Sequence, residues 1–145
     1  MAIVIPNGIL NNPPLGYVRQ WLLENTQLIA VVDMQRDLFQ PRNDTQTSMV
    51  LARRLGEREK AKPPKHPIFF AVTTKIGHDK RGNPIYVRDD EGMDLLEERK
   101  IEVKAVEDGS LVTKAISEKG PILDDQLPMI PKLFAEWAKK NGICL

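Results

Sequence analysis

Cysteine and histidine are scarce in this chain. Cys144 is the single cysteine among 145 residues, and His66 and His78 are the two histidines. One cysteine excludes an intramolecular disulfide and a cluster of cysteine metal ligands, and it fits a protein of the reducing cytoplasm. The histidines are separated by an apolar run and have no carboxylate at ligand spacing, so we expect no metal site.

Long apolar runs and an excess of charge of either sign are also missing. No run approaches the roughly 18 consecutive apolar residues of a transmembrane helix, and residues 2–5 are too few for a signal-peptide core. The chain has 21 Lys and Arg against 20 Asp and Glu, a net charge of +1. It therefore has no global attraction for nucleic acid or membranes, and any nucleic-acid surface must be a local patch.

A glycine-rich loop between a strand and a helix is absent, and so is the acidic residue that binds a ribose beyond such a loop. The best-placed turn, residues 6–9, contains one glycine. These absences disfavour a small α/β enzyme that binds a nucleotide by its phosphates.

The chain does have an unbroken apolar run at its start, residues 2–5. Such a run predicts a strand buried on both faces, as in a parallel sheet covered by helices. Pro6 ends the strand because it has no N–H, and Asn7-Gly8 suits a turn. Ligands of open α/β sheets bind at the carboxyl ends of strands, so Pro6, Asn7 and Gly8 are predicted to form a cleft wall. Because termini are usually frayed, we expect the domain to begin upstream of Met1.

Residues 12–15 read Asn-Pro-Pro-Leu. This is close to the Asp/Asn/Ser-Pro-Pro-aromatic motif with which amino-methyltransferases hold a target amino group. Leu15, however, lacks the ring that would stack on an extruded base. A helix start explains the same residues, with Asn12 as N-cap and Pro13 at the first helical position. We favour that interpretation and expect the helix to end near Asn25.

Further apolar runs predict the rest of a sheet. They are residues 27–32, 47–52 and 68–72, with a hairpin return at 85–87. The spacing of the first two strands is that of a βαβ crossover, which predicts that they are parallel and that the crossover is right-handed. The third strand is predicted to be antiparallel to the second, because the connection between them holds no helix.

The remaining stretches are polar or amphipathic. Residues 55–65 are predicted to be a solvated charged linker, and residues 88–120 a partly ordered polar excursion without catalytic chemistry. An apolar stripe at helical spacing within residues 122–141 predicts a final helix that packs on the core.

Two polar stretches that follow strands, residues 33–46 and 75–84, are rich in side chains that can bond to phosphates and base edges. The candidate DNA contacts are Arg36, Arg42, Thr45, Thr47, Lys75, Lys80 and Arg81. For residues 33–46, an ordinary solvated connection with Phe39 in the core remains the alternative.

Taken in order, several segments resemble one family. They are Ala2–Leu10, Leu28–Asp33, Leu38–Pro41, Thr47–Leu51, Ala71–Tyr86 and Asp124–Pro128. Their sequence and order resemble the carboxyl half of an N-6 adenine DNA methyltransferase. The closest match is the methylation (modification) subunit of type I restriction–modification systems.

The resemblance implies an α/β fold: the carboxyl half of a doubly wound, Rossmann-like methyltransferase sheet with an antiparallel terminal strand. Residues 1–87 would be a partial methyltransferase core, 88–121 a polar excursion or linker, and 122–145 a C-terminal helix packed on that core. The S-adenosylmethionine loop and the catalytic Asn-Pro-Pro-aromatic motif would lie upstream of Met1. Residues 12–14 would then be a decoy.

The resemblance also implies a parent protein that transfers a methyl group from S-adenosylmethionine to adenine in DNA, beside separate specificity and restriction subunits. We expect no catalytic or cofactor-binding residue here, no bound cofactor, and no activity of this chain alone. The alternative is a non-catalytic DNA- or protein-binding module. An open edge on the first strand would favour self-association.

Overall fold

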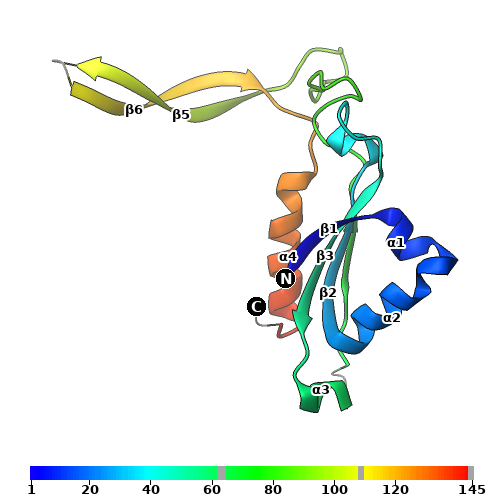
Figure 1. The fold of residues 1–145 in the computed structure, drawn as a ribbon. Helices are drawn as coiled ribbons and strands as arrows, with labels where there is room; N and C mark the ends of the chain where they lie inside the picture. Colours follow the sequence, from blue (N-terminus) through cyan, green and yellow to red (C-terminus); the bar gives the residue numbers. More distant parts are fainter. Residues whose placement is uncertain (62–64, 108–109, 144–145) are drawn as a thin grey trace.

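Four strands form a mixed sheet, and two longer strands form a separate ribbon (Figure 1). The computed structural model describes residues 1–61, 65–107 and 110–143. The sheet contains β1 (Ala2–Pro6), β2 (Thr26–Asp33), β3 (Thr47–Arg54) and β4 (Phe69–Val72), and the ribbon contains β5 (Leu96–Glu107) and β6 (Ser110–Pro121). The helices are α1 (Asn7–Asn11), α2 (Gly16–Asn25), α3 (Glu57–Ala61) and α4 (Ile130–Lys140). The predicted α/β class is confirmed at this level.

The strands of the sheet are ordered β1-β3-β2-β4. β3 is antiparallel to both β1 and β2, and β4 is parallel to β2. The predicted antiparallel pairing of the second and third strands is confirmed. The predicted parallel direction of the first two strands is confirmed, because both run antiparallel to β3, which lies between them. The crossover through α2 fixes their common direction but not their adjacency.

β1 is an edge strand, and its outer side pairs with no strand in the described part of the chain. Ile5 is buried, but Ile3 and Val4 are 44% and 48% exposed. Ile3 and Val4 are successive residues and so point to opposite faces of the strand. The prediction of a strand buried on both faces is therefore wrong, because neither face of β1 is fully covered. The expected open edge on the first strand is present.

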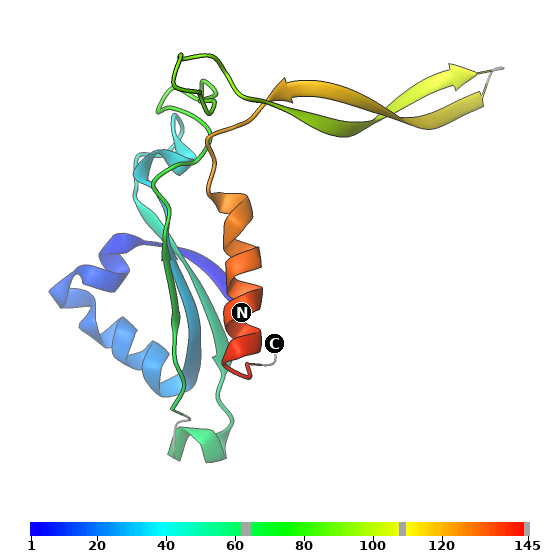
Figure 2. The same ribbon diagram turned by 180° about the vertical axis from the view of Figure 1, so that it is seen from behind.

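The main core lies between the sheet and α4, while α1 and α2 lie over the opposite face (Figures 1 and 2). Phe69 of β4 is 9% exposed. Its ring centroid lies 5.4 Å from that of Phe134 and 5.5 Å from that of Trp137, both on α4. These aromatic contacts confirm that the apolar stripe of the final helix packs on the core. The helix begins at Ile130, after a 3₁₀ turn at Leu127–Met129, and so later than predicted.

The turn predicted at Asn7-Gly8 is wrong, because these residues begin α1, and the helix predicted from Asn12 begins only at Gly16. α1 ends at Asn11, a 3₁₀ turn covers Pro13–Leu15, and α2 follows. Asn12 occupies an N-cap position, but its side chain makes no capping hydrogen bond. Its carbonyl oxygen instead accepts a hydrogen bond of 2.8 Å from Nη1 of Arg19. The break follows from the adjacent prolines, which have no N–H groups for a helical ladder.

Three polar segments differ in detail from their predictions. Residues 57–61 of the expected linker form α3, while residues 62–64 lie outside the described residues. The expected strand at residues 85–87 is reduced to an isolated bridge between Tyr86 and Leu123. The expected excursion contains the regular β5–β6 ribbon, which projects away from the sheet (Figure 2). Within the described ranges, no helix combines the length and apolar character needed to cross a membrane.

Candidate functional site

A polar cluster connects the first residue of α1 to β2 and β3, at the end of the sheet where β1 and β2 finish. Asn7 Nδ2 donates a hydrogen bond of 2.8 Å to Asp33 Oδ1. Ser48 Oγ donates to Asn7 Oδ1 at 2.6 Å and lies 3.2 Å from Asp33 Oδ1. Ser48 is only 2% exposed, so this hydroxyl depends on the cluster for its partners. The cluster fixes the predicted cleft wall, Pro6-Asn7-Gly8, against β2 and β3.

Gln46 extends this cluster toward solvent. Its side-chain Nε2 lies 3.4 Å from both carboxylate oxygens of Asp33. Its backbone carbonyl oxygen accepts a hydrogen bond of 2.9 Å from the backbone N–H of Asn7. The sequence interpretation named Asn7 but missed Asp33, Gln46 and Ser48. Asp33 could have been found, because it directly follows a buried strand and so lies at its carboxyl end. Ser48 could not, because its role depends on β3 lying between β1 and β2.

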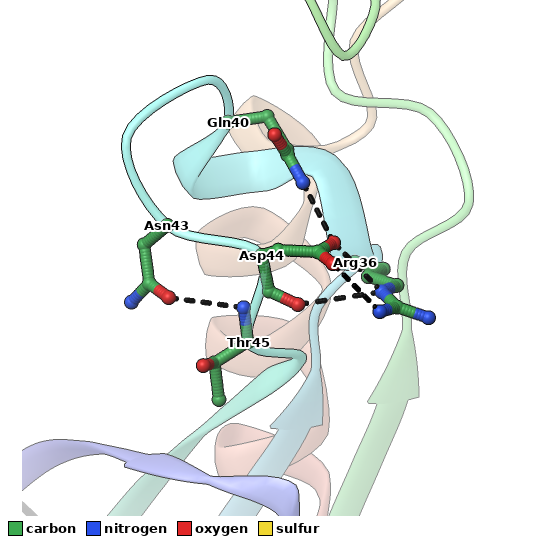
Figure 3. A network of polar contacts seen from close by, with 5 residues as sticks. All are labelled: Arg36, Gln40, Asn43, Asp44 and Thr45. Carbon is green, nitrogen blue, oxygen red and sulfur yellow. Dashed lines mark hydrogen bonds and ion pairs between the residues drawn. The ribbon is translucent and has the colours of Figure 1, made fainter.

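The loop after β2 is organised by one exposed ion pair (Figure 3). The Arg36 guanidinium contacts the Asp44 carboxylate through Nε at 3.0 Å and Nη2 at 2.9 Å. Gln40 Nε2 donates to the same carboxylate at 2.7 Å. The hydrogen bond between the two side chains lowers the pKa of Asp44 and raises the pKa of Arg36. Arg36 is thus engaged within its own loop rather than free for a ligand.

The other predicted residues of this loop differ in accessibility. Arg42 and Thr45 are exposed. Thr47 is 6% exposed, and its Oγ1 has no hydrogen-bond partner among the described residues. Its hydroxyl therefore does not reach the surface in this conformation. Phe39 is 40% exposed, whereas Leu38 packs against the core, so the alternative with Phe39 in the core is wrong.

The loop after β4 is organised by an aspartate. The Asp79 carboxylate accepts from the side-chain amide of Asn83 at 3.0 Å and from the backbone amides of Asn83 and Arg81 at 2.9 and 2.8 Å. These hydrogen bonds, the Asn83 side chain first, lower the pKa of Asp79. Gly77 and Gly82 adopt φ of 77° and 86°, which other residues rarely tolerate. The turn therefore presents Lys80 and Arg81 at its tip, and both are exposed.

The two predicted DNA-contact loops meet around one hollow of about 450 Å³. Gln35 and Asp37 line it from the loop after β2, and residues 74–81 line it from the loop after β4. Its charged side chains are mixed, being Lys75, Lys80, Arg81, Asp37, Asp79 and Asp124. Lys75 forms an ion pair of 2.9 Å with Asp124. Of the predicted contact cations, Arg42, Lys80 and Arg81 form no ion pair with any residue that the structure describes. Lys80 and Arg81 line the hollow, whereas Arg42 lies outside it.

The acidic, histidine and cysteine side chains of the described residues are not grouped as metal ligands. In residues 1–61, 65–107 and 110–143, no group of three or more His, Cys, Asp or Glu side chains could hold a metal ion. His78 Nδ1 lies 2.8 Å from the carbonyl oxygen of Asp79, and His66 Nδ1 lies 2.8 Å from that of Pro67. Each histidine is thus explained by local backbone contact.

Comparison with known proteins does not identify the chain. No protein-family model matches it, and no curated protein sequence matches it significantly. Its function is therefore argued from the residues, their geometry and the resemblance given above.

Proposed function

We propose that this chain is part of an N-6 adenine DNA methyltransferase, the methylation (modification) subunit of a type I restriction–modification system. It supplies a cleft wall and DNA-contacting loops, while the cofactor loop and catalytic motif belong to another part of the parent protein. The resemblance across residues 2–86 and 122–140 supports this proposal. So does the antiparallel course of β3 beside β1 and β2, since the family implies an antiparallel terminal strand.

The observation that carries the proposal is the meeting of the loops after β2 and β4 around one hollow. Their exposed cations, Arg42, Lys80 and Arg81, suit phosphate oxygens, which take half or more of the hydrogen bonds in protein–DNA complexes. Arg36 and Lys75 are paired with Asp44 and Asp124, and would exchange these partners on binding DNA. The Pro6-Asn7-Gly8 segment, where β1 passes into α1, lies at the same end of the sheet and would border the substrate.

The decisive experiment is methyl transfer by the complete polypeptide that the gene encodes, purified with its specificity subunit. We expect labelled methyl to pass from S-adenosylmethionine to adenine in DNA, and we expect this chain alone to show no shift in melting temperature with the cofactor. Absence of transfer by the complete polypeptide would overturn the proposal. A cofactor-dependent rise in the melting temperature of this chain would show that the cofactor site is misplaced.

The contact residues are tested by the triple variant Arg42→Ala, Lys80→Ala and Arg81→Ala. Loss of three phosphate contacts lowers the slope of log K against log salt by about 2 to 3 and weakens DNA binding at low salt. Lys132→Ala, Lys139→Ala and Lys140→Ala on α4 remove the same charge elsewhere and serve as the control. Equal losses in both variants would mean that only net charge matters.

The alternative is a non-catalytic DNA- or protein-binding module. The same exposed cations favour it, and it needs no cofactor loop. It differs in one outcome: this chain alone would bind DNA in a salt-sensitive manner, and the complete polypeptide would transfer no methyl group.

A further inference from the structure

The β5–β6 ribbon leaves the outer edge of β5 unpaired (Figures 1 and 2). Among the described residues its strands pair only with each other, in continuous register from Leu96 opposite Pro121. At the base of the ribbon the Ile122 amide donates to the Leu95 carbonyl at 2.9 Å. The Leu96–Pro121 pair is therefore a non-hydrogen-bonded pair. It follows that even-numbered residues of β5 direct their N–H and C=O groups to the open edge.

These same residues carry side chains of alternating charge. In order they are Leu96, Glu98, Lys100, Glu102, Lys104 and Val106, and all six are exposed. Residues two apart on a strand share a face, so the charges form one row along the ribbon. A row with an apolar residue at each end and alternating signs between them is complementary to itself when reversed.

We propose that two copies of this chain associate by antiparallel pairing of their β5 edges about a two-fold axis at Ile101. In this register Glu98 faces Lys104 of the second copy, and Lys100 faces its Glu102. Leu96 faces Val106 of the second copy. All outward backbone groups from Leu96 to Val106 then find partners, and the two ribbons form one four-stranded antiparallel sheet. The interface is isologous, as expected of a two-fold dimer.

Neighbouring registers are unfavourable, which selects this one. A two-fold axis at Lys100 would place Lys100 opposite itself and Glu98 opposite Glu102. An axis at Glu102 would place Glu102 opposite itself and Lys100 opposite Lys104. Like charges directly opposite each other destabilise a sheet, whereas opposite charges stabilise it. The alternating row therefore opposes pairing when the axis moves by one residue. An axis moved by two residues, to Arg99 or Val103, keeps only half of the opposite-charge pairs, so the row favours the axis at Ile101.

The shape of the molecule leaves room for this pairing. Leu96 lies at the base of each ribbon and faces Val106 near the tip of the other. At about 3.3 Å per residue, the two bases are about 33 Å apart along the paired strands. The mixed sheets and α4 helices of the two copies thus lie at opposite ends of the paired ribbons.

Charge-exchange variants of the full chain test the proposal by sedimentation equilibrium at low salt. Lys100→Glu with Lys104→Glu makes the row wholly acidic, and Glu98→Lys with Glu102→Lys makes it wholly basic. We expect the wild-type chain to dimerise and each variant alone to dimerise at least about tenfold more weakly, because like charges then face each other. An equimolar mixture of the two variants should restore the dimer as a heterodimer.

Lys132→Glu with Lys139→Glu on α4 makes the same change in net charge as the acidic ribbon variant, and should leave the dimer intact. Far-ultraviolet circular dichroism checks that each variant retains its fold. A wild-type chain that stays monomeric would mean that the charges protect the edge from pairing, and would overturn the proposal. Dimers that persist in both ribbon variants, as pairing at β1 would give, or a mixture without heterodimer, would overturn it as well.

Discussion

The mixed sheet and the β5–β6 ribbon are both built from paired strands, but different forces hold them. The sheet packs Ala30, Val32 and Phe69 against α4, and these side chains are at most 9% exposed. The ribbon has no helix over either face, and Val106 and Leu111 near its tip are 70% and 69% exposed. Isolated two-stranded hairpins are marginally stable in water. We therefore expect the packed sheet to resist unfolding more than the ribbon, although the ribbon's strands are longer.

The open edges of β1 and β5 differ in the same way. β1 presents an apolar strand without charge, whereas β5 presents the alternating row of Glu and Lys. An apolar edge accepts many partners, because backbone pairing and apolar contact discriminate little. A charged row discriminates by register and by sign. The long strand is therefore the more selective edge of the two.

The largest expected effect is a loss of unfolding free energy when a core side chain between the sheet and α4 is truncated. Phe69→Ala removes a ring that contacts both Phe134 and Trp137. We expect a loss of about 3 to 5 kcal/mol in the free energy of unfolding, from lost burial and the cavity left behind. Ile101→Ala in the ribbon is the matched control, and should change the unfolding of the sheet by less than about 0.5 kcal/mol. Urea denaturation followed by tryptophan fluorescence measures both.

Equal losses in the two variants would mean that the ribbon and the sheet unfold as one cooperative unit, and that their stabilities do not differ as we expect. A loss confined to Phe69→Ala would sharpen it, because it would locate the cooperative core between the sheet and α4.

An intermediate loss of stability is expected at the polar cluster where β1 passes into α1. Ser48→Ala removes the hydroxyl that donates to Asn7 beside Asp33. Asn7 is half-buried, so loss of this hydrogen bond should cost about 1 kcal/mol, near the lower end of the cost for a fully buried acceptor. Since Asn7 and Ser48 are in contact, the double variant with Asn7→Ala should lose less than the sum of the single losses. Thermal unfolding of all four proteins gives this coupling, and additive losses would show that the cluster does not act as a unit.

The sequence predicted the parts of the fold that local pattern controls. Apolar runs located β1 to β4, and the helical stripe located the packed face of α4. The place of β3 between β1 and β2 was missed, because strand order depends on long-range pairing that spacing does not specify. The ribbon was missed because charged residues stand on both faces of β5, Glu98 and Lys100 on one face and Glu97 and Arg99 on the other. Neither face is therefore apolar, and a search for apolar faces finds no period of two.

The candidate site shows the same division. Each of the loops after β2 and β4 was predicted as a DNA contact from its polar composition. Their meeting around one hollow depends on β4 lying beside β2, which no local signal states. The pairing of Arg36 with Asp44 was also missed, since the residues are eight positions apart in a segment without periodic structure.

The smallest expected effect concerns that ion pair. Arg36 and Asp44 have side chains that are 62% and 65% exposed, so solvent and salt screen their attraction. Arg36→Ala should lower the melting temperature only slightly, and added salt should abolish the difference. The pair should also show in the titration of Asp44, because the hydrogen bond from Arg36 holds its pKa below the ordinary value.

The sign of the pH dependence follows from that direction. A carboxylate with a lowered pKa in the folded chain stabilises it fully above the unfolded pKa, and this contribution is lost as pH falls through the folded value. In Arg36→Ala the carbon-detected NMR titration of Asp44 should therefore move to higher pH, toward its ordinary range. An unchanged titration would mean that the hydrogen bond from Gln40 to the same carboxylate is enough to keep the pKa of Asp44 low. The loop after β2 would then resemble the loop after β4, where neutral amide donors from Asn83 and the backbone stabilise the Asp79 carboxylate.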